Sequence, residues 1–269
     1  MGRKRKKKSS SKRKFDFKKI GRTLWFTAKV VVPATILCVG SWFSYQVVRA
    51  DLVQDPFFRL KTVNVRTDGI LTPGDVVSHL PVRLNMSLFE VSLPEVATAL
   101  REMTSIKRFN IRKHFPSALE IDIYERKPLF QLKVKGSSAY HWIDSEGMAF
   151  KALSSESSGL LIVEDEKENA KTVAIGKQYP FYKFQRVASA IAIARENKVL
   201  EKEGLKKVIV DDSGDVRIVL KDNLELRIGR DRFNERLAKL VLVDDILSNE
   251  QERRKANYID LRFDDIVVR

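Results

Sequence analysis

The sequence predicts an α+β protein with a single N-terminal transmembrane helix, a β-α-α-β-β module and a β-rich domain with two longer helices. Three observations predict this class. A long uncharged stretch follows a basic tail. Several later segments alternate between apolar and polar residues, as strands do, and others repeat their apolar residues at helical spacing. The hydrophobic fraction of 43% excludes a wholly disordered chain. The single cysteine, Cys38, excludes a disulfide framework and a cysteine-based zinc site.

The positive charge is concentrated at the N-terminus. Residues 1–22 hold twelve Lys and Arg against one acidic residue, so that only +4 of the net charge of +15 lies on the rest of the chain. Because Lys and Arg stay on the cytoplasmic side of a span, we expect residues 1–23 to form a cytoplasmic tail. Such a run also attracts anionic lipid. Nucleic-acid binding is an alternative use of the tail, but a basic flank needs no second role, and we expect no nucleic-acid partner.

The uncharged stretch has the length of a membrane span. Val30 to Val48 has no charged residue, and as a helix it is about 28 Å long, close to the hydrocarbon core of a bilayer. Apolar residues begin at Leu24, so the predicted transmembrane helix covers 24–48, with the lipid bilayer as its partner. A cleaved signal peptide would have a shorter apolar region and a small-residue cleavage site. Residues from about 50 onward are then expected outside the cytoplasm.

Residues 57–127 are predicted to form the β-α-α-β-β module. Its expected elements are a strand at 57–68, a helix that starts at Pro73 after the N-cap Thr72, a helix from about Pro94, and strands at 106–113 and 118–125. The apolar positions on one face of these strands form the expected core: Val63, Val65, Phe109, Ile111, Leu119, Ile121 and Ile123.

Residues 128–269 are predicted to form the β-rich domain, with a mixed or antiparallel sheet. Alternating segments predict strands at 130–134, 140–143, 216–220, 224–228 and 257–263. One helix is expected at 180–197, with Phe184, Val187, Ala188, Ile191 and Ala194 at helical spacing. A second is expected to carry Phe233, Leu237, Leu240, Val241 and Leu247 on one stripe. Residues 153–159 and 164–170 are expected to be polar loops.

No catalytic, phosphate-binding or dinucleotide-binding motif stands in the sequence. The three histidines come from unrelated elements, and none pairs with another at i, i+4, which excludes a zinc site on one helix. Acidic pairs such as Asp211-Asp212 adjoin turns, where Asp is common for local hydrogen bonding. We therefore expect no catalysis, no cofactor and no metal, and a protein that acts by binding other proteins.

Five segments, in order along the chain, resemble a known family: Phe58–Val65, Ile106–Pro116, Leu119–Pro128, Trp142–Phe150 and Tyr258–Phe263. They are similar to the first POTRA strand, the "V-x-x-A-x-V-x-R-x-W-P" and "L-x-I-x-V-x-E-R-x-P" lines, the "V-D-x-x-G-x-x-F" segment and the "V-D-L-R-Y" strand of the bacterial cell-division family FtsQ, also called DivIB. The resemblance covers nearly the whole chain. It departs from the family at His114-Phe115, which replaces the usual tryptophan.

This resemblance implies a POTRA-like domain at 57–127 and an FtsQ-type β domain at 128–269. It implies a non-enzymatic scaffold at the division septum, single-pass in the bacterial inner membrane, with its C-terminal part in the periplasm. The implied partners are membrane-bound division proteins such as FtsB and FtsL, with FtsK-, FtsW- and FtsI-like proteins as further candidates. Alternatives are a POTRA-bearing envelope-assembly or secretion factor, which would need many barrel strands, a membrane-anchored cell-wall enzyme, or a DNA tether.

The C-terminal segment is the predicted partner-binding site. We expect Ile266–Arg269 to pair beside the strand at 257–263, after a turn at Asp264-Asp265, and nothing after Arg269 covers this last strand. Its outward N–H and C=O groups then form an open edge, to which an extended segment of a partner can add as a further strand. The predicted partner-binding residues are Tyr258, Phe263, Ile266, Val267, Val268 and Arg269.

Overall fold

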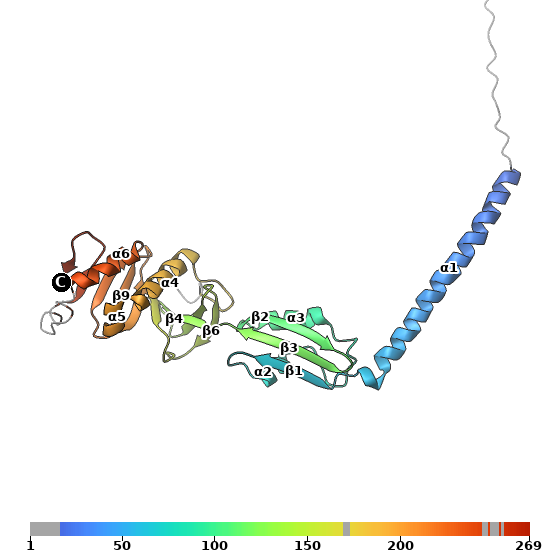
Figure 1. Cartoon of the computed structure of the whole chain (residues 1–269), viewed down its shortest axis with the longest axis horizontal. Helices are drawn as coiled ribbons and strands as arrows, with labels where there is room; N and C mark the ends of the chain where they lie inside the picture. Colours follow the sequence, from blue (N-terminus) through green and yellow to red (C-terminus); the bar gives the residue numbers. More distant parts are fainter. Residues whose placement is uncertain (1–16, 169–172, 244–246, 248–252, 254–255) are drawn as a thin grey trace, which may run out of the picture.

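The computed structural model describes residues 17–168, 173–243, 247, 253 and 256–269, with no side-chain description for 17–28, 30 and 48–51. It confirms the α+β class: a long N-terminal helix is followed by a three-stranded and then a nine-stranded sheet (Figure 1). Each sheet has a hydrophobic core of its own. The tail predicted at 1–23 lies, up to residue 16, outside the described residues.

The N-terminal helix α1, Phe17–Gln54, is longer at both ends than the predicted segment. Its Val31–Gln54 part is apolar and long enough to cross a membrane, with a mean hydropathy of 1.5. Leu24, Val30 and Val48 lie in this helix, but their side chains lie outside the described residues. The helix ends where Pro56 follows, because a proline disfavours helical geometry in the residue before it.

The three-stranded sheet has the order β1-β3-β2, with β1 parallel and β2 antiparallel to β3. Its elements are η1 Pro56–Phe58, β1 Thr62–Thr67, α2 Pro73–His79, α3 Leu93–Glu102, β2 Ile106–His114 and β3 Ala118–Glu125. The predicted cap is confirmed: Thr72 and Asp75 form a reciprocal capping box. Of the predicted core, Leu119, Ile121 and Ile123 are buried; the half-buried members of that set pack against them.

The nine-stranded sheet is mixed, with the order β12-β11-β10-β9-β8-β7-β4-β5-β6. Its strands are β4 Pro128–Val134, β5 Tyr140–Asp144, β6 Ala149–Leu153, β7 Ile162–Asp165, β8 Leu205–Val210, β9 Val216–Leu220, β10 Glu225–Gly229, β11 Tyr258–Asp260 and β12 Val267–Val268. The parallel pairs are β4–β7, β7–β8 and β10–β11. The prediction of a loop at 164–170 is therefore wrong for Glu164 and Asp165, which are the last two residues of β7. This strand has only four residues, too few to show a clear alternation of apolar and polar side chains.

The helices of this domain are α4 Phe181–Glu196, α5 Lys198–Glu203 and α6 Phe233–Ala238, followed by the 3-10 helix η2 Lys239–Val243. The first is as predicted. The stripe predicted for the second is wrong at Val241, which is 68% exposed. A 3-10 helix repeats every three residues, so Leu237, Leu240 and Val243 share the buried face, and Val241 turns outward.

Candidate functional site

The two sheets are joined through Arg126, which directly follows β3. Its guanidinium pairs with the carboxylate of Asp144, a buried residue of the nine-stranded sheet, and lies 3.3 Å from that of Glu146. Lys107 of β2 adds a 2.9 Å ion pair to Glu146. The Thr104 hydroxyl donates a 2.9 Å hydrogen bond to the carbonyl of Phe150. The "E-R-x-P" and "D-x-x-G" segments of the sequence therefore meet at this joint.

The preceding residue, Glu125, stabilises a loop of the three-stranded module. Its carboxylate accepts hydrogen bonds from the N–H groups of Ile70 and Leu71, at 2.9 and 3.0 Å, and so holds the loop between β1 and α2. A Cβ at Gly69 would lie 2.5 Å from the carboxyl carbon of Glu125, so a side chain there would displace this carboxylate. Two adjacent residues of one motif thus have different roles: Glu125 holds a loop of the three-stranded module, and Arg126 attaches this module to the nine-stranded sheet.

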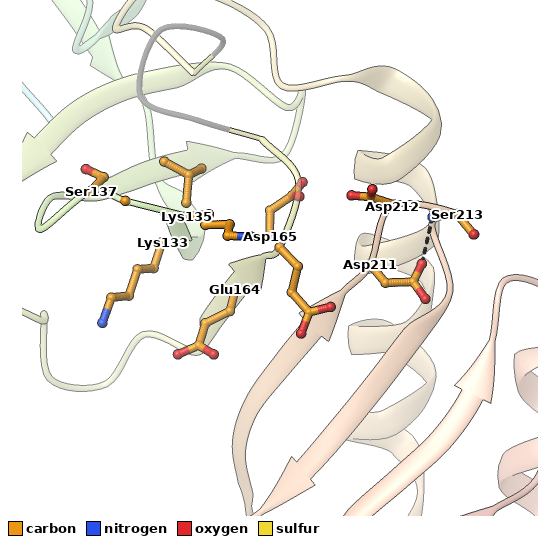
Figure 2. Close-up of a pocket in the computed structure, with 11 residues that line it drawn as sticks. Lys133, Lys135, Ser137, Glu164, Asp165, Asp211, Asp212 and Ser213 are labelled. Atoms are coloured by element: carbon orange, nitrogen blue, oxygen red, sulfur yellow. Dashed lines mark hydrogen bonds between the residues drawn. The ribbon is translucent and has the colours of Figure 1, made fainter.

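A pocket of about 680 Å³ lies at the carboxyl ends of the parallel strands β4, β7 and β8. Figure 2 shows side chains from these three strand ends around it, with Asp165 as the last residue of β7 and Asp211 directly after β8. Asp165 accepts 2.8 Å hydrogen bonds from the fully buried Lys183 ammonium, and Asp211 accepts the N–H groups of its own turn. These acids are engaged in holding the structure, and no nucleophile–base pair lies beside them among the lining residues.

Burial, reinforced by the negative charge of Asp165, raises the pKa of Tyr179 far above its ordinary value. The phenol therefore stays protonated and donates a 2.5 Å hydrogen bond to that carboxylate. Among the described residues, no group of three or more His, Cys, Asp and Glu side chains could hold a metal ion.

The C-terminal edge has the predicted pairing. β12 is antiparallel to β11, with Ile259 opposite Val268 and Asp260 opposite Val267. Tyr258 and Arg269 exchange both backbone hydrogen bonds, at 2.8 and 3.0 Å. Because hydrogen-bonded and non-hydrogen-bonded pairs alternate along an antiparallel ladder, the N–H and C=O of Val268 point away from β11. β12 stands at the end of the strand order, so within the described residues these groups face no strand.

The side chains of β12 alternate between the two faces of the sheet. Ile266 and Val268 are half-buried and pack against the core, whereas Val267 and Arg269 are exposed. Phe263 is 59% exposed. Tyr258 is half-buried, with the Arg227 guanidinium 3.7 Å from its ring centroid. The backbone of the edge is therefore accessible together with the side chains of Phe263, Val267 and Arg269, while those of Ile266 and Val268 hold β12 in place.

The sequence did not predict that Leu242 is an exposed apolar residue near this edge. Its side chain is 76% exposed, the most of any residue in η2. The η2 helix reaches the last turn of the chain, because the Lys239 ammonium donates a 2.6 Å hydrogen bond to the carbonyl of Phe263. No periodic signal identifies Leu242, since its exposure depends on the change from α to 3-10 geometry.

Asp260 and Arg262 stabilise β11 at this edge. The Arg262 guanidinium donates to both carboxylate oxygens of Asp260, at 2.7 to 3.2 Å, and lies 3.5 Å from Asp215. Burial by itself would raise the pKa of Asp260, but the hydrogen bonds from Arg262 outweigh burial and lower that pKa below its ordinary value. The "D-L-R" segment is therefore a structural clamp that holds the strand on which β12 pairs.

Two other strand edges among the described residues, those of β6 and β2, are less open. At the opposite end of the nine-stranded sheet, the first residue of β6, Ala149, donates to the carbonyl of Lys177 and accepts from the N–H of Gly176, at 3.0 and 2.7 Å. In the three-stranded sheet, β2 carries four Lys and Arg residues, which discourage pairing with a further strand. The apolar β12 edge lacks both protections.

Two family models match the chain at these modules. "POTRA domain, FtsQ-type" matches residues 58–126, and "Cell division protein FtsQ/DivIB, C-terminal" matches residues 133–262. Between them they include every strand of both sheets except β12 and the first five residues of β4. The chain belongs to the FtsQ/DivIB family. Family membership makes it a cell-division protein, as the resemblance implied.

Relatives in several bacteria are similar at low identity, some over most of the chain and others over about half of it. The "Cell division protein FtsQ" of Anaeromyxobacter sp. (strain K) is 23% identical over 209 residues, covering 76% of this chain and 68% of the relative. The protein of the same name in Methylomonas methanica is 22% identical over 238 residues, covering 87% and 86%. The "Cell division protein DivIB" of Clostridium acetobutylicum is 22% identical over 125 residues, covering 46% and 49%.

Proposed function

We propose that this FtsQ/DivIB family member is a non-enzymatic scaffold that captures another division protein by β-strand addition at β12. The observation that carries the proposal is the outward N–H and C=O of Val268 at the end of the nine-stranded sheet. A partner's extended segment would continue the ladder through main-chain hydrogen bonds. The exposed side chains of Val267 and Phe263 would give it apolar contacts.

The proposed partners are FtsB- and FtsL-like proteins at this edge, with FtsK-, FtsW- and FtsI-like proteins as further members of the assembly. The support is the family resemblance together with the open edge. We propose the domains as predicted, a POTRA-like domain at 57–127 and a β domain at 128–269. They are joined by the ion pairs of Arg126 with Asp144 and Glu146.

The proposed place of action is the division septum, with α1 in the inner membrane, the basic tail in the cytoplasm and both sheets in the periplasm. The charge asymmetry across α1 supports this orientation. The absence of catalytic motifs in the sequence and the structural roles of the pocket's acids support a binding rather than an enzymatic role.

The test is capture of an FtsB-like partner by the full chain in detergent. Val268→Pro removes the outward N–H without removing a donor to β11 and is compatible with an edge strand, so we expect capture to be lost while the near-UV circular dichroism spectrum is kept. Val268→Thr is the matched control, since it keeps the N–H and the branched shape, and it should still capture the partner. Val267→Pro breaks the β11–β12 pairing itself and should also lose capture.

Capture that survives both proline substitutions would rule out strand addition at β12. A septal signal from a fluorescent fusion tests the location separately, and a uniform membrane signal in dividing cells would contradict it.

A further inference from the structure

Four phenylalanines from three separate segments form a ring cluster at one end of the three-stranded sheet. They are Phe57 and Phe58 of η1, Phe89 before α3 and Phe115 in the turn between β2 and β3. Centroid distances are 5.2 Å for Phe57–Phe58, 5.1 Å for Phe58–Phe89 and 5.4 Å for Phe89–Phe115. We call these four residues the Phe cluster.

The Phe cluster is open to the surroundings rather than part of the core. Phe57 is 58% exposed, Phe115 57% and Phe89 40%, and only Phe58, at the centre of the contacts, is half-buried. Backbone hydrogen bonds fix the three segments against one another: the N–H of Leu88 donates to the carbonyl of Phe58 at 2.8 Å, and that of Lys61 to the carbonyl of Ser117 at 2.8 Å. The exposed rings are thus held on a rigid support.

The position of the cluster follows from the chain. The apolar part of α1 ends at Gln54, and Phe57 comes three residues later, within about 11 Å of it even if the link is fully extended. The Asp55 carboxylate accepts a 2.8 Å hydrogen bond from the N–H of Phe57, which makes this link a compact turn. Figure 1 shows that the end of the sheet where β2 passes into β3 is the one nearest to α1.

Cationic side chains accompany the rings. Arg59 directly follows η1, Lys61 lies two residues further, and Arg83 lies in the loop that carries Phe89; all three are exposed. Among the described residues, no ion pair is formed by any of them. Exposed aromatic rings beside unpaired cations are the combination that favours a membrane interface containing anionic lipid.

We propose that the Phe cluster docks on the extracytoplasmic surface of the bilayer, with its rings at the boundary between headgroups and acyl chains. The proposal rests on α1 crossing the membrane, which is part of the proposed function. Docking gives the three-stranded module a second attachment to the bilayer and fixes its tilt relative to α1. The β domain, attached through Arg126, is thereby held at a defined height above the membrane.

The test uses the full chain in nanodiscs that contain phosphatidylcholine and anionic phosphatidylglycerol, with Cys38→Ser as the background. A nitroxide label is attached at Phe115→Cys, and its collisions with oxygen, which concentrates in the bilayer, are compared with those of a water-soluble nickel complex. Ile70→Cys is the matched control: Ile70 is 61% exposed but lies beyond the opposite end of the sheet, next to Glu125. A label at Val39→Cys reports on α1 itself.

We expect oxygen collisions to dominate at positions 115 and 39 and nickel collisions to dominate at position 70. Equal nickel access at 115 and 70, with position 39 in the bilayer, would overturn docking and leave the membrane span intact. Nickel access at 39 would instead contradict the span.

Because the label at position 115 replaces one ring of the Phe cluster, a second variant tests the remaining rings. With the label kept at 115, Phe57→Ser should shift the collision balance toward nickel. Ile175→Ser, at a 39% exposed side chain of the other domain, should leave the balance unchanged. An unchanged balance with Phe57→Ser would mean that the rings do not hold the module on the bilayer and would overturn the proposal.

Discussion

At the scale of single residues, the most consequential group is a buried ion pair beneath the pocket. Lys183 is fully buried in α4, and its ammonium lies 2.8 Å from both oxygens of Asp165 at the end of β7. The same carboxylate accepts the hydroxyl of Tyr179 and the N–H groups of Lys167 and Glu168. This carboxylate therefore joins the helix to the middle of the sheet, and its hydrogen bonds compensate for the loss of water around two charges.

We predict that Lys183→Met destabilises the β domain by about 3–5 kcal/mol, because it leaves the Asp165 carboxylate buried without its counter-charge. The measurement is the free energy of unfolding from a urea titration of the full chain in detergent. The double variant Lys183→Met with Asp165→Asn removes both charges and should be more stable than the single variant. If the single variant matched the parent in stability, the ion pair would not hold α4 to β7.

The same scale shows what sequence reasoning could not reach. A lysine within an amphipathic helix looks exposed in the sequence, and nothing there indicates that Lys183 meets Asp165. The Phe cluster is missed for the same reason: its rings come from positions 57, 58, 89 and 115, and only the fold brings them together. Contacts between distant segments leave no periodic signal in a single sequence.

At the scale of elements, prediction succeeded where the local pattern and the environment agree. The Thr72 N-cap of α2, the alternation of β3 and the helical spacing of α4 each depend on neighbouring residues, and each is present in the structure. The strand β7 was not predicted, because its four residues are too few to show an alternating pattern. The stripe predicted for the last helix is correct at Phe233, Leu237, Leu240 and Leu247, which are buried, and wrong only at Val241, because the helix tightens to 3-10 geometry at Lys239.

The clamp on β11 gives a pH prediction at this scale. The pKa of Asp260 is lowered from its ordinary value of 3.8, so the ionised form favours the folded state. Its contribution to stability is fully present above pH 3.8 and is lost as the pH falls through the lowered folded-state pKa. We expect Asp260→Asn to have a lower melting temperature than the parent chain at pH 6, and the difference to shrink as the pH falls below 3.8.

The measurement is the melting temperature of both chains in detergent between pH 6 and the acid limit of solubility, followed by circular dichroism. Arg262→Gln should behave in the same way, because it removes the donor that lowers the pKa of Asp260. A difference in melting temperature that stays constant over the whole range would contradict this account of the clamp.

At the scale of the whole molecule, the two modules are connected by few contacts. Arg126 reaches Asp144 and Glu146, Lys107 reaches Glu146, and Thr104 reaches the backbone of Phe150. The Arg126 and Asp144 side chains are only 14% and 2% exposed, so this pair lies inside the joint. The sequence shows the motif residues but not their partners, which lie 18 and 20 positions away.

We predict that Arg126→Ala loosens the joint without unfolding either module. The Asp144 carboxylate still accepts the N–H groups of Glu146 and Met148, at 2.8 and 2.9 Å, so the turn that it caps should persist. Spin labels on the two modules of the full chain should therefore give a broader distance distribution in pulsed electron resonance, with an unchanged circular dichroism spectrum. Arg112→Ala, which removes an exposed charge of the same type on β2, is the control. An equally narrow distribution in the Arg126 variant would show that other contacts fix the joint.

The central claim, that β12 captures a division partner through its free backbone, is tested most directly by amide hydrogen exchange at single-residue resolution. In the free chain the N–H of Val268 points away from β11 and should exchange rapidly, whereas that of Arg269, bonded to the carbonyl of Tyr258, should be slower. Addition of an FtsB-like partner should slow exchange at Val268 strongly, because the partner's carbonyl then accepts this hydrogen bond. Binding of the partner with no change in exchange at Val268 would contradict strand addition and place the contact elsewhere on the chain.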